Sequence, residues 1–110
     1  MDVASEIRKA VETGKVILGA KQTLKALKIG KAKAVIIAKN CPDTIKKDVA
    51  YYAKLAGTPL YVFEGDNKAL GTVCGKPFSV STMAVLSPGE SKILEILNSL
   101  AGGSQREEKT

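Results

Sequence analysis

Residues 32–38 read AKAVIIA, a run in which Lys33 is the one polar side chain and three consecutive side chains are β-branched. A strand without a polar face is stable only where other elements cover both of its faces, as happens in α/β proteins. A helical pattern that ends at a glycine precedes this run, and a second helical pattern follows it. The chain is therefore expected to fold as a sheet with helices packed on both sides.

The same alternation of helical and strand periods continues along the rest of the chain, with turn residues at the boundaries. Helices are expected over residues 3–13, 20–29, 42–57, about 66–73 and from 87 onward, and strands over residues 15–18, 32–38, 60–63 and 83–86. Asp2 and Asp66 are expected to cap the first and fourth helices. Residues 87–90, SPGE, have the pattern of a capping box and are expected to open the last helix.

These elements predict a single-domain three-layer α/β/α sandwich with a small, mixed, four-stranded sheet, whose strand order the sequence leaves open. A chain of 110 residues is long enough for one core. The domain is expected to span residues 1–101. Residues 102–110, GGSQREEKT, contain no apolar side chain and are expected to form a disordered tail.

The chain contains Cys41 and Cys74 but no histidine. This excludes Ser-His-Asp and Cys-His catalysis, and it makes a structural zinc site implausible. No apolar run approaches the roughly 20 residues that a membrane helix needs, and the first ten residues lack the apolar core of a signal peptide. We therefore expect an intracellular, cytoplasmic protein, monomeric when free, that is not an enzyme. It is expected to use no cofactor, metal ion, small-molecule substrate or membrane.

The positive charge is concentrated in the first half of the chain. The net charge is +6, and between Thr13 and Pro42 there are seven lysines and no acidic residue. A solubilising surface normally mixes charges of both signs, whereas a stretch of one sign inside a folded region favours a polyanionic partner. The charge distribution therefore predicts binding to nucleic acid.

Residues 14–23, GKVILGAKQT, resemble a phosphate-binding loop but do not complete its motif. Ala20 stands where the motif needs lysine, and no serine or threonine follows at the metal-binding position. What remains is a glycine, Gly19, at the turn from a strand into a helix, with Lys21 and Gln22 in the first helical turn. A helix N-terminus has unpaired N–H groups and a partial positive charge, so this turn is a candidate phosphate site.

One face of the same helix carries a stripe of lysines: Lys21, Lys25 and Lys28. Helical geometry separates this stripe from the residues expected to face the core, Ala20, Leu24 and Leu27. The stripe is either a solvated face or a continuation of the anion site. Gly19 lies at the N-terminal end of this helix, which we call its mouth. The stripe is therefore interpreted as a continuation of the anion site.

Two further side chains are candidates for contacts with RNA bases, and each also has an alternative structural role. Asn40 follows the apolar strand and could bind a base edge, or it could cap a turn or helix. Phe78 lies in the loop segment GKPF and could stack on an unpaired base, or it could anchor the core.

Three segments taken together resemble a known family: LGAKQTLKALKIGKAKAVIIAKNCP, YYAKLAGTPLYVFEG and ALGTVCGKPFSV. They are similar to the large-subunit ribosomal proteins numbered thirty in the archaeal and eukaryotic series, over about residues 3–100. That family is part of a wider group of α/β/α proteins that bind kink-turns, which are sharply bent internal loops of RNA. The resemblance implies a structural protein of the ribosome, with ribosomal RNA and neighbouring ribosomal proteins as partners.

The resemblance also implies which residues contact RNA. By the family pattern these are Gly19, Lys21, Gln22, Asn40, Asn67 and Phe78, with Val80 beside Phe78. Lys25, Lys28 and Lys46 are added as neighbours of phosphate groups, on charge and helix geometry.

Two other functions are weighed against this one. A non-ribosomal kink-turn protein of RNA processing or modification usually carries G-x-N-E at the second helix, whereas residues 19–22 here are GAKQ, which favours the ribosomal branch. An enzyme or nucleotide-binding protein using residues 14–23 is disfavoured by the incomplete motif and the missing histidine.

Overall fold

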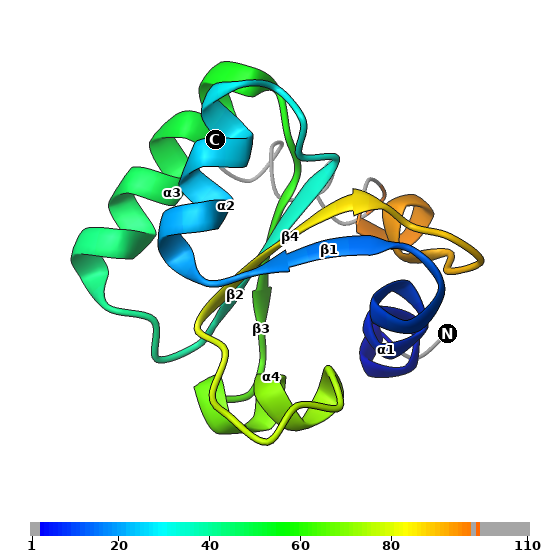
Figure 1. Cartoon of the computed structure of the whole chain (residues 1–110). Helices are drawn as coiled ribbons and strands as arrows, with labels where there is room; N and C mark the ends of the chain where they lie inside the picture. The colour runs from blue at the N-terminus through cyan, green and yellow to red at the C-terminus, as the bar shows by residue number, and fades with distance from the viewer. Residues whose placement is uncertain (1–2, 98, 100–110) are drawn as a thin grey trace.

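A computed structural model describes residues 3–97 and residue 99 (Figure 1). The labelled helices are α1 (Val3–Thr13), α2 (Ala20–Lys28), α3 (Asp43–Ala56) and α4 (Asn67–Val73). The strands are β1 (Lys15–Leu18), β2 (Ala34–Ala38), β3 (Leu60–Phe63) and β4 (Thr82–Ser87). A final helix begins at residue 93 and continues through residue 97.

The four strands form one mixed sheet in the order β1-β4-β2-β3. Strand β4 is antiparallel to both β1 and β2, and β3 is parallel to β2. The carboxyl ends of β1, β2 and β3 therefore lie at the same end of the sheet as the amino end of β4. We call this the Gly19 end, and the opposite end, where β1 begins and β4 finishes, the Gly14 end.

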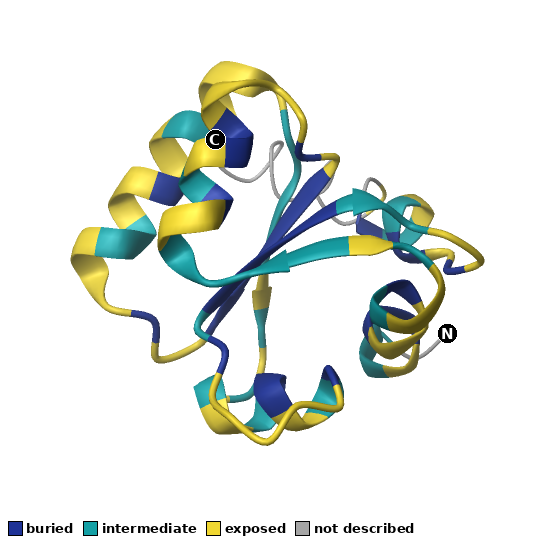
Figure 2. Ribbon diagram, in the orientation of Figure 1, coloured by how far each residue is buried: buried dark blue, intermediate teal, exposed yellow. Residues whose placement is uncertain are grey.

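Helices cover both faces of the sheet, which confirms the predicted α/β/α sandwich (Figures 1 and 2). Strand β2 is buried throughout and divides its side chains between the two faces. Ala34, Ile36 and Ala38 pack with α1, α4 and the final helix. Val35 and Ile37 pack with α2 and α3. The apolar run thus lacks a polar face because each of its faces contributes to a separate half of the core.

Several local predictions are confirmed. Strands β1 and β3 have the predicted bounds, and α1 ends at Thr13, immediately before Gly14. Asp66 caps α4, because its Oδ1 accepts a hydrogen bond of 2.8 Å from the Ala69 N–H. The predicted cap Asp2 and the predicted tail at residues 102–110 lie outside the described residues.

The start of the final helix was predicted wrongly. The segment SPGE does not open it: Gly89 has φ +60°, and the helix begins only at residue 93. The first helical N–H groups are instead satisfied by Ser91, whose Oγ accepts from the Ile93 N–H, and by Glu6 of α1, whose Oε1 accepts from the Lys92 N–H at 2.8 Å. The Ser91 part of this cap is local, whereas the Glu6 part comes from a residue 86 positions earlier, which no local sequence pattern could reveal.

The core stripe of α2 is also shifted from the prediction. The buried residues are Thr23, Ala26 and Leu27, whereas Ala20 and Leu24 are half-buried. Compared with the prediction, α2 is rotated slightly about its axis. The reason is that both α3 and the sheet cover it, from two directions. Among the helices of residues 3–97 and 99, none is long and apolar enough to cross a membrane.

Candidate RNA interface

Four connections meet at the Gly19 end, and backbone hydrogen bonds hold them together. The Gly19 N–H donates to the Thr82 carbonyl at 2.8 Å, which joins the start of α2 to the start of β4. The Ala38 N–H donates to the Ser81 carbonyl at 2.8 Å, and the Lys39 N–H donates to the Gly65 carbonyl at 2.9 Å. The strand order thus joins, by these three hydrogen bonds, residues that are 26 or more positions apart in the sequence.

Gly19 forms the mouth of α2 in a conformation that other residues rarely adopt, with φ 114° and ψ 145°. A Cβ placed on Gly19 would meet nothing within 4 Å, so the glycine is required by its backbone angles and the space beside it is open. No side chain caps the helix there, and its first turn contains no acidic residue. Lys21 and Gln22 are exposed in that turn. The mouth therefore offers free N–H donors beside a positive charge, as an anion site requires.

The other predicted lysines are placed differently from one another. Lys25 is exposed, one turn further along α2 than Lys21. The Lys46 Nζ lies 3.4 Å from the carbonyl oxygen of Lys39, which brings its charge to the Gly19 end. Lys28 is the last residue of α2, roughly 13 Å along the helix axis from Gly19. Its Nζ lies 5.0 Å from the centre of the Tyr52 ring, a cation–π contact that joins α2 to α3.

Asn40 and Asn67 were predicted separately, and the structure makes them one unit. The Asn40 Oδ1 accepts a hydrogen bond of 2.8 Å from the Asn67 N–H, and the Asn40 Nδ2 donates to the Asn67 Oδ1 at 3.1 Å. Asn40 thus joins the end of β2 to the first residue of α4. This agrees with the alternative role predicted for Asn40, that of capping a turn or helix. It is also exposed, and its Nδ2 carries a second N–H that a ligand can accept from.

Phe78 and Val80 lie two residues apart but on opposite sides of their loop. Phe78 is 54% exposed, so the interpretation of Phe78 as a core anchor was wrong. Val80 is 2% exposed and belongs to the core beside β4. The predicted contact of Val80 with RNA must be corrected accordingly: its side chain is not accessible, and only its backbone could take part.

The loop that carries Phe78 is fixed against α4. The Lys76 N–H donates to the Gly71 carbonyl and the Val80 N–H to the Asn67 carbonyl, each at 3.0 Å. A Cβ on Gly71 would collide with the carbonyl oxygen of Phe78, so only glycine lets the loop pass this close. Phe78 is therefore exposed on a firmly held loop.

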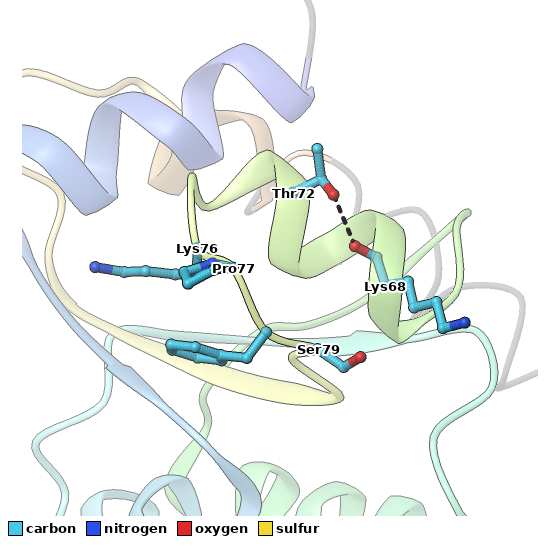
Figure 3. Close-up of a pocket in the computed structure, with 6 residues that line it drawn as sticks. Lys68, Thr72, Lys76, Pro77 and Ser79 are labelled. Carbon is cyan, nitrogen blue, oxygen red and sulfur yellow. Dashed lines mark hydrogen bonds between the residues drawn. The ribbon is translucent and has the colours of Figure 1, made fainter.

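The surface beside Phe78 was not predicted from the sequence. An open hollow of about 330 Å³ lies there, between α4 and the loop that follows it (Figure 3). Its lining residues are Lys68, Thr72, Lys76, Pro77, Phe78 and Ser79. The segment GKPF was the one sequence feature that could have indicated this hollow. Helical spacing alone does not reveal which face of a helix as short as α4 borders a loop.

Three side chains among the described residues have shifted pKa values. Burial raises the pKa of the Cys74 thiol to about 11, despite the opposing charges of Lys76 and Arg8, so the thiol is protonated near neutral pH. The hydrogen bond from the Lys92 N–H lowers the pKa of Glu6, assisted by Ser91 and opposed by desolvation. Burial raises the pKa of Tyr61, and the charge of Glu64 adds to the effect.

The fold and this surface define a class: a small α/β/α domain with an uncapped, basic helix mouth, exposed amides and an exposed aromatic ring at one end of its sheet. Residues 1–95 match the model of the ribosomal protein L7Ae/L30e/S12e/Gadd45 family. The chain belongs to that family, and the resemblance found in the sequence is confirmed.

Within this family, the chain is similar to archaeal proteins of one kind. The large ribosomal subunit protein eL30 of Methanothermobacter thermautotrophicus is 50% identical over 97 residues, covering 88% of this chain and 99% of that protein. The eL30 protein of Methanocaldococcus jannaschii is 48% identical over 103 residues, or 94% of each chain. That of Methanopyrus kandleri is 52% identical over 93 residues, covering 84% of this chain and 85% of that protein.

A solved structure supports the fold alone. A Bacillus halodurans protein of unknown function superimposes with a TM-score of 0.78, covering 92% of this chain and 97% of that chain. At 21% identity this similarity carries no functional conclusion.

Proposed function

We propose that this protein is a structural component of the large ribosomal subunit and that it binds a kink-turn in ribosomal RNA through the Gly19 end of its sheet. Family membership and the eL30 relatives, which are named as large-subunit proteins, support the ribosomal role. The observation that carries the RNA-binding role is the uncapped mouth of α2, with Lys21 beside it and no acid in its first turn.

In this proposal, the mouth of α2 binds the bent backbone. The free N–H groups after Gly19 donate to phosphate oxygens, and Lys21 adds a charge that is unfavourable beside a helix N-terminus until an anion arrives. Gln22 adds a neutral donor and acceptor. Lys25 and Lys46 increase the positive potential around the same strand of RNA.

Bases are held by the other side chains of this end. The Asn40–Asn67 pair presents amide groups in a fixed orientation to a base edge or a ribose, and Phe78 stacks on a splayed base. Shape selects the RNA in this arrangement, because most contacts reach the backbone and only a sharply bent backbone brings the bases within reach. The protein acts as a structural component without catalysis, as a monomer when free, and beside other ribosomal proteins when assembled.

A binding measurement with two RNAs tests this function. The first RNA contains a kink-turn, and in the second its sheared purine pairs are replaced by Watson–Crick pairs, so that the helix is straight. We expect the kinked RNA to bind at least tenfold more tightly at equal salt concentration. Equal affinity for both RNAs would leave only non-specific binding and would refute the proposal.

The ribosomal part is tested by sedimentation of ribosomes from cells that carry the protein. We expect it to sediment with large subunits and to stay bound in moderate salt. Recovery only in small ribonucleoproteins would instead indicate a role in RNA processing or modification. Titration with ATP or GTP, with and without magnesium, should produce no heat of binding at micromolar concentration.

A further inference from the structure

The two outer strands of the sheet are protected to different degrees against pairing with another chain. Strand β1 begins with the exposed Lys15, and its pairing with β4 is irregular between Lys15 and Val16. A lysine and an irregular register are both devices that discourage edge-to-edge pairing. Strand β3, at the opposite edge, reads LYVF and pairs with β2 in an unbroken register. The β3 edge therefore lacks both of these devices.

The open edge of β3 presents backbone donors and acceptors at every second residue. The Pro59 carbonyl accepts a hydrogen bond of 3.0 Å from β2, and the Gly65 carbonyl accepts one of 2.9 Å from Lys39, which follows β2. Backbone groups of successive strand residues point to opposite sides, so the even-numbered residues of this stretch direct theirs away from β2. These are Leu60, Val62 and Glu64. Within the described part of the chain, β2 is the only strand that pairs with β3.

One apolar side chain is fully accessible at this edge. Val62 is 46% exposed. Since side chains alternate along a strand, it lies on the same face as Leu60, which packs with the half of the core beneath α2 and α3. On the opposite face Tyr61 and Phe63 are half-buried against the other half of the core. The edge thus offers an apolar contact on each face to the side chains of an added strand.

The side of α3 that is turned away from α2 borders the β3 edge. Tyr52 marks the α2 side by its contact with Lys28, and the buried Val49 and Ala53 face the sheet. At roughly 100° per residue, helical geometry then places these residues on the side away from α2: Asp43, Lys46, Lys47, Ala50 and Lys54. Lysines predominate there, and the small side chain of Ala50 leaves room for the side chains of a partner.

Positive charge dominates most of the length of this edge. Lys47 and Lys54 are exposed, and Lys54 lies in the last turn of α3, toward the Gly14 end. The acidic residues beside the edge all lie at the Gly19 end; they are Asp43, Glu64 and Asp66. A segment docked along β3 is therefore expected to carry an acidic side chain at the position near Lys54.

We propose that β3 accepts an extended segment of a second protein as a further strand of the sheet, with an apolar side chain of that segment beside Val62 and an acidic one two positions away, beside Lys54. Hydrogen bonds to the outward backbone groups supply affinity, and the two side-chain positions supply specificity. A protein strand is favoured over RNA because the donors and acceptors alternate at strand spacing around an apolar side chain. The surface goes beyond the RNA-binding function, with which it shares only Lys46.

A peptide titration tests this surface on the full-length protein. The probe is the peptide Thr-Glu-Thr-Val-Thr-Glu-Thr, which carries its apolar and acidic side chains on one face when extended. We expect the peptide, at millimolar concentration, to shift the NMR amide signals of Val62 and Glu64 and to slow their hydrogen exchange about fivefold. The amides of Tyr61 and Phe63, which face β2, should change little. The control peptide Thr-Lys-Thr-Val-Thr-Lys-Thr should produce much smaller shifts.

Matched variants separate the edge from the rest of the surface. Val62→Glu places a charge at the contact and should abolish the shifts, whereas Leu55→Glu makes the same change at an exposed side chain on the side of α3 nearer α2 and should not. Lys54→Ala should weaken binding of the acidic peptide about threefold, and Lys25→Ala, on α2, should leave it unchanged. Both lysines are exposed, so their removal should not alter the melting temperature, and this pair decides the question if Val62→Glu unfolds.

Photocrosslinking identifies the partner in cells that carry the protein. Benzoyl-phenylalanine is placed at Val62 or, as a control, at Leu55, and the products are treated with nuclease before mass spectrometry. We expect a nuclease-resistant product from Val62 alone, joined to a segment of another protein that has an acidic residue two positions from the attachment site. A nuclease-sensitive product would identify the partner as RNA, and a product with a second copy of this chain would indicate a dimer contact. Either result overturns the inference, as does an acidic peptide that leaves the Val62 and Glu64 signals unmoved.

This inference and the proposed function fail separately. A protein that prefers kinked RNA but shows neither the peptide effect nor the crosslink retains the proposed function and loses the β3 docking surface. Conversely, equal affinity for kinked and straight RNA refutes the proposed function, and the peptide and crosslinking results still decide the docking surface.

Discussion

At the Gly14 end of the sheet, polar groups are bonded to one another across long stretches of sequence, whereas at the Gly19 end several of them face solvent. The Glu90 N–H donates to the Thr13 Oγ1 at 2.9 Å, and the Ser91 Oγ donates to the carbonyl of Glu6 at 2.6 Å. At the other end Lys21 and Gln22 are exposed, and Asn40, although bonded to Asn67, is exposed as well. One end is built for stability and the other leaves its donors for a ligand.

The glycines show the same contrast. A Cβ on Gly14 would collide with the carbonyl oxygen of Ser87 and would lie 2.8 Å from the Gly89 nitrogen, whereas a Cβ on Gly19 would meet nothing within 4 Å. Gly14 is needed because the backbone of the β4–helix connection crosses above it. Gly19 is needed because of its φ angle. A glycine thus allows close backbone packing at the Gly14 end, and at the Gly19 end a glycine leaves the start of α2 accessible to a ligand.

The largest effect is expected from Gly14→Ala. Its new methyl group would press on backbone atoms, which cannot move as a side chain end can, so we expect a loss of about 3 kcal/mol in the free energy of unfolding. Urea denaturation measures this. Gly19→Ala is the matched variant: it should cost about 1–3 kcal/mol through backbone strain and should weaken RNA binding as well. If Gly14→Ala lowered RNA affinity more than stability, the division between the two ends would be wrong.

A smaller effect is expected from Phe78→Ala. Because the ring is 54% exposed, its removal should leave the melting temperature nearly unchanged. RNA affinity should fall by roughly 1–3 kcal/mol through lost stacking. Leu55→Ala, which truncates a 67% exposed side chain on α3, is the control and should leave binding unchanged. A melting temperature that falls while affinity stays constant would return Phe78 to a structural role.

Lys21→Ala should affect function and stability in opposite directions. The slope of log K against log salt should fall by about 0.9, the value for one phosphate contact. The free protein should become more stable by about 0.3–1 kcal/mol, because a cation is removed from the N-terminus of α2. Lys33→Ala, an exposed lysine at the Gly14 end, should do neither. Unchanged salt dependence in Lys21→Ala would place Lys21 outside the interface.

The smallest expected effect is the pH dependence that Glu6 adds to stability. Its pKa in the folded protein lies below the ordinary value of 4.5, so the carboxylate contributes stability that is fully present above about pH 4.5 and is lost as pH falls through the folded pKa. Glu6→Gln keeps an acceptor for the Lys92 N–H but does not titrate. The difference in urea midpoint between wild type and Glu6→Gln should therefore shrink as pH is lowered from 6 to 3. A constant difference would show that Glu6 acts without its charge.

The sequence by itself determined the order of the elements, the burial of β2 on both faces, the Asp66 cap and the glycine at the mouth of α2. Each of these depends on the period of side chains along one segment or on contacts within one turn, and such short-range features are visible in the sequence. Lys21, Gln22 and the lysine stripe followed from helix geometry in the same way.

Only the tertiary structure decided which segments meet. The strand order placed the Asn40–Asn67 pair, the loop of Phe78 and the mouth of α2 at one end, and it gave the final helix a cap from Glu6, 86 residues before Lys92. It also turned Phe78 outward and Val80 inward, although both are apolar residues of one loop. The physical reason is that pairing between distant segments depends on the competition of many possible contacts in the folded chain, which no local pattern encodes.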